Sequence, residues 1–442
     1  RLKSIICMFQ GITMIETILK EGKKSGFSTV EVFRVIMEKQ EYEKFIDYHA
    51  THSVKTDRII VRAFWDFGDP VGFSLSVPGI ESIKSAFFSI GSVTVPDKKE
   101  NYSELLPCSV EKVKLNIFDG SIHREDNKRF DNLVENIQEI LISFPGLSLK
   151  KIYFSQNLKK IYVANTRQLN IKYKKTNFNL ILKFGLRDNV IDINQTSTCF
   201  DNIDPFRMIP RAFNLLNSLT DETGVNKKSR FFIFSPEASV FVLKEFSDQF
   251  KLGQQASLKG IQLSSVLNIV DNPLMDEQAG SVPFDDEGVQ SGEKYLVRKG
   301  IFTHSISNIS SAFHNGTLSS GNGFRTERSL FPQVNFSNLF IKPSVISLKK
   351  LMIEAGTGIL VSLLKLKFVE ENNFIFSAYG YHFKDGDIEK PVHFYFKTSF
   401  LSYFINIKKV SRETKFFHSY FNLGSPYILI EAKWKTSNMF EI

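Results

Sequence analysis

Residues 57–66, DRIIVRAFWD, and residues 71–77, VGFSLSV, indicate the fold class of this chain. Both stretches are short and rich in β-branched and aromatic residues, and turn-forming residues lie between them at 68–70. This pattern predicts two antiparallel strands joined as a hairpin. A helical pattern follows at about residues 79–91, which places helices beside an antiparallel sheet and predicts an α+β fold.

The rest of the N-terminal half contains further helical and strand-like patterns. Helical spacing covers residues 12–24 and 30–46, and in the second stretch the apolar residues fall largely on one side. We also expect helices at residues 127–144 and 205–220, and strands at residues 148–156, 159–165 and 169–186. Since the gaps between these three strands are short, they predict an antiparallel meander.

Strand-like runs dominate the C-terminal half. They cover residues 230–234, 295–305, 337–342, 374–384, 393–396 and 427–433. Long loops at residues 268–292 and 314–335 are rich in Gly, Ser, Asn and Pro, and loops of this length are usually functional or mobile. We expect two domains: residues 1–200, an antiparallel sheet with helices, and residues 201–442, which are β-rich and barrel-like.

The composition is that of a soluble globular protein. Of 442 residues, 42% are hydrophobic and 23% are charged, which excludes a disordered or a membrane-spanning chain. The net charge of +9 permits contact with a polyanion, but the basic residues are scattered in short groups such as Lys150-Lys151 and Lys174-Lys175. We therefore expect a solvated basic surface and no nucleic-acid partner.

The cysteines and the apolar segments indicate the compartment. Cys7, Cys108 and Cys199 lie far apart and form no CxxC pair, which favours a reducing cytoplasm. Charged residues follow the first apolar residues too soon for a secretory signal. The most apolar later run, residues 358–369, is interrupted by lysines and is too short to span a bilayer.

The loop at residues 268–292 contains the most specific local pattern. Asp271 and Pro273 mark a turn, and Gly280-Ser281 marks a tight bend. The segment Phe284-Asp285-Asp286-Glu287-Gly288 then places three acids in a row. A structural turn, a peptide-contact loop and a cation site are all possible interpretations. Side chains of adjacent residues diverge on an extended chain, which disfavours the cation site.

Several such segments occur in a characteristic order along the chain. They are Val163-Ala164-Asn165-Thr166-Arg167, Val270-Asp271-Asn272-Pro273, Pro283 to Gly288, Ser320-Gly321-Asn322-Gly323, Asn338-Leu339-Phe340-Ile341 and Gly424-Ser425-Pro426. The series resembles the TldD/PmbA family, also called modulators of DNA gyrase. The first segment carries Gln168 where the family pattern has glycine. The resemblance implies an N-terminal α/β domain, a C-terminal β-rich domain, and a dimer around a chamber where unfolded peptides are degraded or precursors trimmed.

The same resemblance implies that the catalytic site has been lost. Active members carry HExxxH on a helix, with a later cysteine as a further zinc ligand. In the matching segment, Lys244 and Gln249 stand at the two histidine positions, Glu245 stands at the base position, and Gly424-Ser425-Pro426 has no cysteine beside it. The opening Ser235-Pro236-Glu237 resembles the TldE/PmbA branch, the non-catalytic half of a heterodimer.

We therefore expect a metal-free, catalytically inactive, TldE/PmbA-like cytoplasmic subunit without a cofactor. Its expected partners are a TldD-like zinc-bearing subunit or a second copy, and an unfolded peptide. The candidate contact loop comprises Asp271, Phe284, Asp285, Asp286, Glu287 and Gly288. The alternatives are an autonomous metal-dependent peptidase with ligands from other positions, and a polyanion-binding modulator protein.

Overall fold

The computed structural model describes most of the chain. The described residues are 14–45, 48–66, 69–76, 79–93, 102–123, 127–219, 230–254, 260–326, 329–370, 373–419, 421–434 and 439–441. Helices and sheets both contribute, so the α+β class is confirmed. Cys7 lies outside the described residues, whereas Cys108 and Cys199 are free thiols. None of the described helices is long and apolar enough to cross a membrane.

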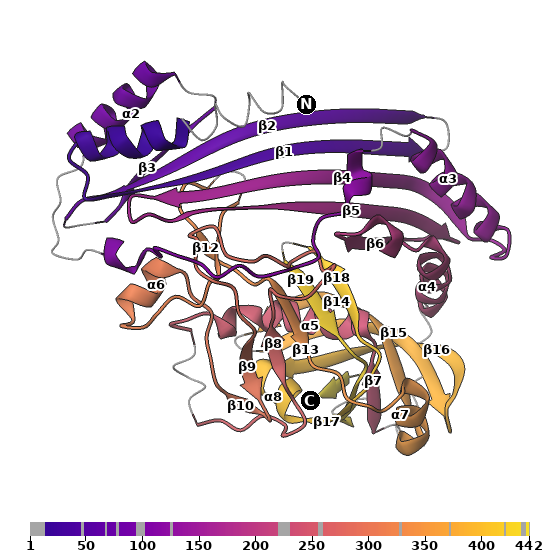
Figure 1. Cartoon of the computed structure of the whole chain (residues 1–442). Coiled ribbons are helices and arrows are strands. Elements are labelled where there is room, and N and C mark those ends of the chain that lie inside the picture. The colour runs from indigo at the N-terminus through magenta and orange to yellow at the C-terminus, as the bar shows by residue number, and fades with distance from the viewer. Residues whose placement is uncertain are drawn as a thin grey trace.

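The N-terminal half builds one long, curved antiparallel sheet (Figure 1). Its strands, in spatial order, are β3 (Val71–Leu75), β2 (His49–Phe64), β1 (Thr29–Phe45), β4 (Ser148–Asn165), β5 (Asn170–Leu186) and β6 (Asn189–Ser197). The helical elements are a helix over residues 14–24, α2 (Ile80–Val93), α3 (Asn127–Leu141), α4 (Pro205–Ser218), η1 (Ser103–Leu105), η2 (Gly120–His123) and η3 (Phe200–Asn202). The hairpin and the helices near 79–91, 127–144 and 205–220 are thus confirmed.

The helix expected at residues 30–46 was wrong, because these residues form β1. Val30, Val32 and Phe33 are buried, since β1 lies between β2 and β4 and both of its faces are covered near its start. Burial on two faces hides the alternation that identifies a half-exposed strand. Further along β1, Glu38 pairs with Lys55 and Lys160 of the neighbouring strands, and such cross-strand pairs support extended backbone.

The expected meander differs in its strand boundaries. Residues 148–156 and 159–165 belong to one strand, β4, and Asn157 pairs with Lys39 on one side and Asn177 on the other. The expected strand at residues 169–186 is present as β5, and β6 continues the antiparallel meander beyond it. The expected gap at residues 157–158 is part of the strand, because the two neighbouring strands continue the ladder through it.

The C-terminal half builds two larger sheets and one small one. The six-stranded sheet has the order β10 (Ile301–Phe302), β9 (Lys294–Arg298), β8 (Ile269–Asp271), β13 (Asn338–Ile341), β19 (Asn422–Ser425) and β18 (Lys415–His418). The eight-stranded sheet has the order β17 (Ile407–Val410), β20 (Ile428–Glu431), β7 (Phe231–Phe234), β14 (Thr357–Glu370), β15 (Asn373–Lys384), β16 (Asp387–Ser399), β22 (Met439–Glu441) and β21 (Lys433–Trp434). The small sheet pairs β11 (Gly323–Phe324) with β12 (Gln333–Val334).

The helices of this half are α5 (Pro236–Phe246), η4 (Ser247–Phe250), α6 (Ile309–His314), α7 (Leu348–Ala355) and α8 (Phe400–Ile405). The largest apolar core contains Val242, Leu243 and Phe246 of α5 together with side chains from both large sheets, such as Leu339 and Phe376. The expected β-rich character is present. The described strands form open sheets and no closed barrel, because each sheet order has two ends.

Candidate functional site

Of the positions that resemble the family's zinc motif, Gln249 lies in η4, whereas Lys244 and Glu245 lie on helix α5. It begins directly after β7, because Ser235 caps it by accepting a 3.2 Å hydrogen bond from the backbone N–H of Ala238. Pro236 occupies the first turn, where its fixed backbone angle suits a helix start. The helix packs against β19, the strand that contains Ser425. Helix α5 therefore lies next to the strand that contains Ser425.

The side chains at the motif positions do not fit a zinc ion. Lys244 is exposed on the last turn of α5, Glu245 is half-buried, and Gln249 lies beyond the helix in η4. An ammonium group has no lone pair to donate, and an amide is a poor zinc ligand beside imidazole. Ser425 is fully buried, and its hydroxyl donates to the backbone oxygen of Pro426 at 2.9 Å. Within the described residues, no three His, Cys, Asp or Glu side chains gather closely enough to hold a metal ion.

Asp285 and Glu287 are buried hydrogen-bond acceptors. The Asp285 carboxylate accepts from the backbone N–H groups of Glu287 (3.0 Å), Val289 (2.9 Å) and Gly323 (2.8 Å). Burial, together with the neighbouring Glu287, raises the pKa of Asp285 well above its ordinary value. Its three contacts fix the turn and attach it to the start of β11.

Glu287 belongs to a buried charge network that crosses from the C-terminal half to the first sheet. Its Oε1 accepts from Arg62 at 2.8 Å, and its Oε2 accepts from the Ile309 backbone N–H at 2.8 Å. Arg62 also binds both carboxylate oxygens of Glu31, at 3.1 and 2.6 Å, and Arg325 binds Glu31 at 2.6 Å. We call Glu31, Arg62, Glu287 and Arg325 the charge network.

The charge network is balanced within itself. Arg62, Glu31 and Glu287 are at most 2% exposed, so no side chain of the three relies on water. Burial alone would raise the pKa of Glu31, but the guanidinium groups of Arg62 and Arg325 outweigh it and lower that pKa. Two carboxylates and two guanidinium groups thus satisfy one another, as buried charges must.

A second buried network joins the motif loops of the C-terminal half. Asp271 accepts from the backbone N–H and the hydroxyl of Ser337, at 2.9 and 2.8 Å, and from the Asn322 amide at 2.8 Å. Asn338 donates to the Asn272 carbonyl at 2.7 Å and to the Ser281 hydroxyl at 2.9 Å. The motifs that identify the family therefore converge in space as interior connections between loops.

Asn165 secures the corresponding turn in the N-terminal half. Its side-chain oxygen accepts from the backbone N–H groups of Arg167 and Leu169, at 2.8 and 3.2 Å, and its amide donates to the Pro107 carbonyl at 2.8 Å. Gln168 stands in this turn with φ of 75°, a left-handed conformation that glycine adopts without strain. This left-handed backbone explains why the family pattern has glycine at this position. In this chain the same conformation is adopted by Gln168.

The candidate contact loop lies mainly inside the molecule. Phe284 is 4% exposed and packs edge-on against Tyr173 of β5, with ring centroids 5.0 Å apart. Gly288 is buried with φ of 79°, and an added Cβ would approach the Leu169 side chain to 2.5 Å. Asp286 is half-exposed, and burial raises its pKa to about 6 although Arg325 opposes the change. Of the six candidate side chains, that of Asp286 remains the most accessible.

Lys175 of β5 supports the same loop. Its ammonium donates to the backbone oxygens of Ala279 (2.5 Å) and Ser281 (2.9 Å), and its side chain is buried. Burial, with a smaller contribution from Lys159, lowers the pKa of Lys175 to about 7. The basic pair Lys174-Lys175 is therefore not a surface feature, because one of its two members points into the molecule.

Sequence reasoning did not single out Glu31, Arg62 or Arg325 as members of a common network. Arg62 offered a signal, since it interrupts the otherwise apolar run from Ile59 to Phe64. A charged residue in the middle of a buried strand needs a buried partner. The partner could not be identified, because Glu287 lies 225 residues further along the chain.

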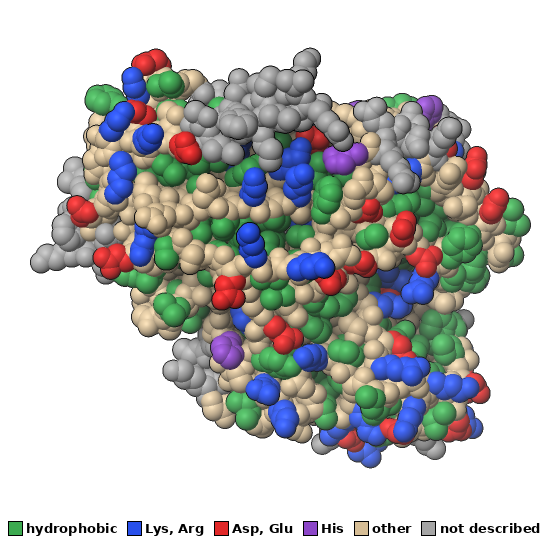
Figure 2. Space-filling model, viewed as in Figure 1, with side chains coloured by type: hydrophobic (Ala, Val, Ile, Leu, Met, Phe, Trp, Pro, Cys, Tyr) green, Lys and Arg blue, Asp and Glu red, His purple; other side chains and the backbone are tan. Residues whose placement is uncertain are grey.

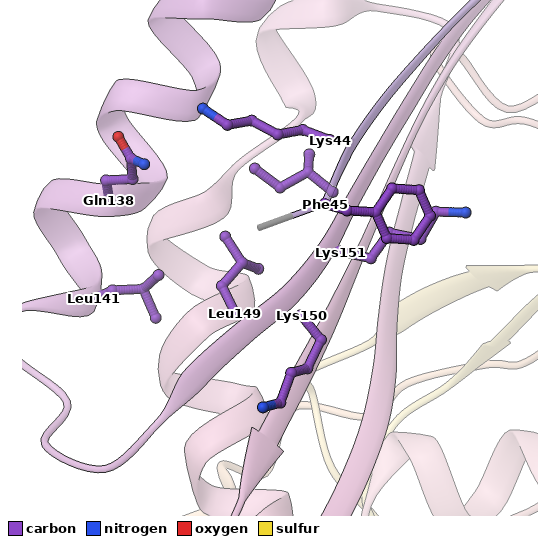
Figure 3. A pocket seen from close by; sticks show the side chains of 8 residues that line it. Lys44, Phe45, Gln138, Leu141, Leu149, Lys150 and Lys151 are labelled. Carbon is purple, nitrogen blue, oxygen red and sulfur yellow. The ribbon is translucent and has the colours of Figure 1, made fainter. Parts of the chain in front are cut away.

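Two hollows lie on the first sheet, away from the motif residues. One, of about 260 Å³, has a floor of Leu141 and Leu149 between α3 and the start of β4, with Lys44 and Lys150 at its rim (Figure 3). The other, of about 300 Å³, lies over β2, β1 and β4 and includes Ser53, Lys55 and Gln156. Neither hollow is lined by the motif positions Lys244, Glu245 or Gln249.

Charges of both signs are interspersed over the face shown in Figure 2, which shows no continuous basic surface. Many of the described lysines and arginines are paired with acids, among them Lys55, Lys151, Lys160 and Lys409. Exposed ion pairs of this kind contribute little to stability. They do place acidic groups among the basic ones, so that positively charged surface areas stay small.

The comparisons with known proteins agree with the fold. Residues 249–433 match the model of the PmbA/TldA metallopeptidase C-terminal domain. A zinc metalloprotease TldD homolog from Saccharolobus solfataricus is 22% identical over 306 residues, covering 65% of this chain and 68% of the relative. A metalloprotease TldD homolog from Buchnera aphidicola is 29% identical over 132 residues, which span 29% of this chain and 27% of that relative.

Solved structures show the same fold over almost the whole chain. TldE from Thermococcus kodakarensis superposes with a TM-score of 0.78 at 18% identity, covering 94% of this chain and 98% of that one. A Thermotoga maritima protein described as a candidate modulator of a DNA gyrase gives a TM-score of 0.78 at 17% identity, with 94% and 97% coverage. Residues 249–433 therefore match the C-terminal domain of PmbA/TldA metallopeptidases, and the chain shares its fold with TldE. The chain is similar to proteins of the TldD/PmbA family.

Proposed function

We propose that this chain is the non-catalytic, metal-free subunit of a TldD-type metalloprotease, in the manner of TldE/PmbA. One observation carries the proposal: Lys244, on the last turn of helix α5, and Gln249, in η4, stand at the two ligand positions that the resemblance implies. Without a metal-bound water, Glu245 has no nucleophile to activate. Ser425, buried in the adjacent β19, cannot replace a cysteine thiolate as the later ligand.

The proposed partner is a zinc-bearing TldD-like chain in the cytoplasm, with a second copy of this chain as the other possibility. The proposed substrate is an unfolded peptide that the partner cleaves. We further propose that residues 1–200 and 201–442 are the two domains, joined by the charge network. In this arrangement the intact motif helix serves as scaffold for the complex, while the chemistry belongs to the partner.

The loop at residues 268–292 has a proposed role in this complex. Since Asp271, Asp285 and Glu287 are occupied by internal hydrogen bonds, we propose that contact with partner or peptide uses the outer side of the loop. Asp286 and Gln290 are half-exposed there. A photo-crosslinking residue in place of Gln290 is expected to capture the partner or a bound peptide, and capture of neither would contradict this role.

The central test compares the pure chain with its complex. The isolated chain is expected to contain no stoichiometric zinc and to cleave no unfolded peptide such as casein. The complex recovered from the native host is expected to contain zinc in the other subunit and to show chelator-sensitive hydrolysis. Stoichiometric zinc and chelator-sensitive cleavage by the isolated chain would instead support an autonomous peptidase.

A further inference from the structure

A hollow lies between helix α3 and the strand ends of the first sheet. Its volume is about 260 Å³, and its lining includes four apolar side chains and no acid. Figure 3 shows Leu141 of α3 opposite Leu149 of β4, and Ile152, which is 1% exposed, also contributes to the lining. Leu141 and Leu149 are half-buried, so part of their apolar surface remains in water. We call this site the α3 hollow, and Leu141, Leu149 and Ile152 its floor.

Two lysines lie at the rim of the α3 hollow, on either side of its floor (Figure 3). Lys44 of β1 is the register partner of Ile152 in β4. Lys150 lies at an irregularity of the β4–β5 ladder, and its stem lies against Gly185 of β5. The two ammonium groups therefore approach the hollow from different sides, one from β1 and the other from β5.

The two rim lysines carry positive charge that the protein does not neutralise. Neither Lys44 nor Lys150 forms an ion pair with any of the described residues. The third lysine of the lining, Lys151, is already held by Glu43 at 3.0 Å. The acids of α3 are all exposed, and none of them pairs with a rim lysine in the described part of the chain. A ligand that brings carboxylates to both sides of the floor is therefore complementary in charge.

The size of the α3 hollow indicates how much of a ligand it holds. Sites that enclose a whole small molecule usually measure roughly 300–1,000 Å³, and the α3 hollow is smaller. It holds one side chain, and the rest of the ligand continues across the surface. Gln138 of the lining has an amide that can pair with a peptide group. A polypeptide with one apolar residue between acidic residues fits this combination of floor, rim and size.

We propose that the α3 hollow binds an unfolded polypeptide at an apolar residue flanked by acidic residues, with the apolar side chain on the floor and the carboxylates at Lys44 and Lys150. The inference deepens the proposed function and rests on it for the source of the polypeptide, a substrate held on this subunit before cleavage by the partner. The binding itself requires only this chain.

A peptide series tests the proposal on the native chain. The probe is acetyl-Gly-Glu-Glu-Leu-Glu-Glu-Gly-amide, and titration calorimetry measures its binding to the full chain. Replacement of the central leucine by serine removes the apolar contact and is expected to weaken binding about tenfold or more. Replacement of the four glutamates by glutamines removes the charge and is expected to weaken binding about tenfold. Equal binding of all three peptides would overturn the proposal.

Cross-linking locates the bound peptide. A carbodiimide joins a carboxylate to an amine that it contacts, so mass spectrometry is expected to find the probe attached to Lys44 and Lys150. Attachment spread evenly over exposed lysines such as Lys172 would contradict binding at the α3 hollow.

A charge-reversal variant tests the rim. Lys44→Glu with Lys150→Glu is expected to bind the acidic probe about tenfold more weakly, and to bind a probe with lysines in place of the glutamates more tightly than the native chain does. The matched control, Lys172→Glu with Lys390→Glu, changes the net charge equally at exposed positions elsewhere and is expected to bind like the native chain. Equal effects of both double variants would show attraction by the overall charge alone and would sink the proposal. If circular dichroism shows that the rim variant is unfolded, the peptide series and the cross-links on the native chain decide.

Two other occupants of the α3 hollow would give distinct results. Octanoate that displaces the probe at the same concentration would identify an acyl chain. Self-association that only the rim variant loses, without peptide binding, would identify a second copy of this chain. Either result would overturn the proposal. Because the partner subunit is absent from these measurements, failure here leaves the zinc and hydrolysis tests of the proposed function unaffected.

Discussion

Arg62 and Glu287 lie 225 residues apart in the sequence, and their side chains meet at 2.8 Å inside the protein. Arg62 belongs to β2 of the first sheet, and Glu287 belongs to a loop of the C-terminal half. The bond is one part of the charge network, in which the contact between Arg325 and Glu31 also joins these two regions. The most specific sequence motif of the family therefore ends in a structural connection between the two halves.

Arg62→Leu is expected to destabilise the protein strongly. It would leave the carboxylates of Glu31 and Glu287 buried with one guanidinium group fewer, and breaking a buried ion pair in this way costs about 3–5 kcal/mol. Urea unfolding will measure the free energy of unfolding. Lys84→Leu, which removes an exposed pair with Glu81, is the control and should cost less than about 0.5 kcal/mol. Equal effects of both variants would show that the network does not contribute to stability.

Gly280→Ala is expected to destabilise the protein through a steric clash. An added Cβ would lie 2.0 Å from the Ser337 carbonyl oxygen and 2.6 Å from Asn338 Oδ1, and backbone there cannot move without breaking the Asp271 network. Overpacking typically costs about 1–3 kcal/mol. At Gly292 nothing lies within 4 Å of the same atom, so Gly292→Ala is the matched control. Thermal unfolding should show a lower melting temperature for the first variant alone.

Stability is expected to rise with pH above neutrality because of Lys175. Its pKa in the folded protein is lowered to about 7 by burial, below the ordinary value of 10.5, so the unfolded chain binds more protons between these limits. The free energy of unfolding therefore increases as the pH rises from about 7 toward 10. Lys175→Met should flatten this increase, whereas Lys172→Met, at an exposed position of the same strand, should preserve it. Parallel slopes for both variants would contradict the assignment.

Restoring two histidines to helix α5 is expected to leave the chain inactive. Lys244→His with Gln249→His supplies two imidazoles, but the later ligand position has Ser425 in place of a cysteine. Metal analysis and casein hydrolysis will measure the outcome, with the native chain as control. Chelator-sensitive hydrolysis by this double variant would show that the later ligand comes from another residue.

The sequence predicted the fold class and most helices because those signals are local. The helices near residues 79–91, 127–144 and 205–220 carry a clear 3.6-residue period, and all three are present. Strand β1 was assigned wrongly because both its faces are buried, and β4 was divided because polar residues interrupt its middle. In both cases the neighbouring strands, which lie far away in sequence, determine the structure.

At the candidate site, too, local patterns were predictable from the sequence, whereas contacts between distant residues were not. The order of the motifs was sufficient to identify the family, because each motif is a local pattern. The physical role of the motifs was not predictable. Asp285 accepts a hydrogen bond from the backbone N–H of Gly323, and Glu287 accepts one from Arg62, and both partners lie elsewhere in the sequence. Whether an acid cluster faces a ligand or the interior depends on contacts that no single stretch of sequence contains.

The charge network also sets an order of events during synthesis. Glu31 and Arg325, which are bonded at 2.6 Å, are separated by 294 residues. At typical translation rates of about 5–20 residues per second, the first sheet waits roughly 15–60 s for its last partner to leave the ribosome. During that interval Glu31 and Arg62 stand at an uncovered sheet surface beside apolar residues such as Phe33. We therefore expect this surface of the nascent N-terminal half to become covered only after Arg325 has been synthesised.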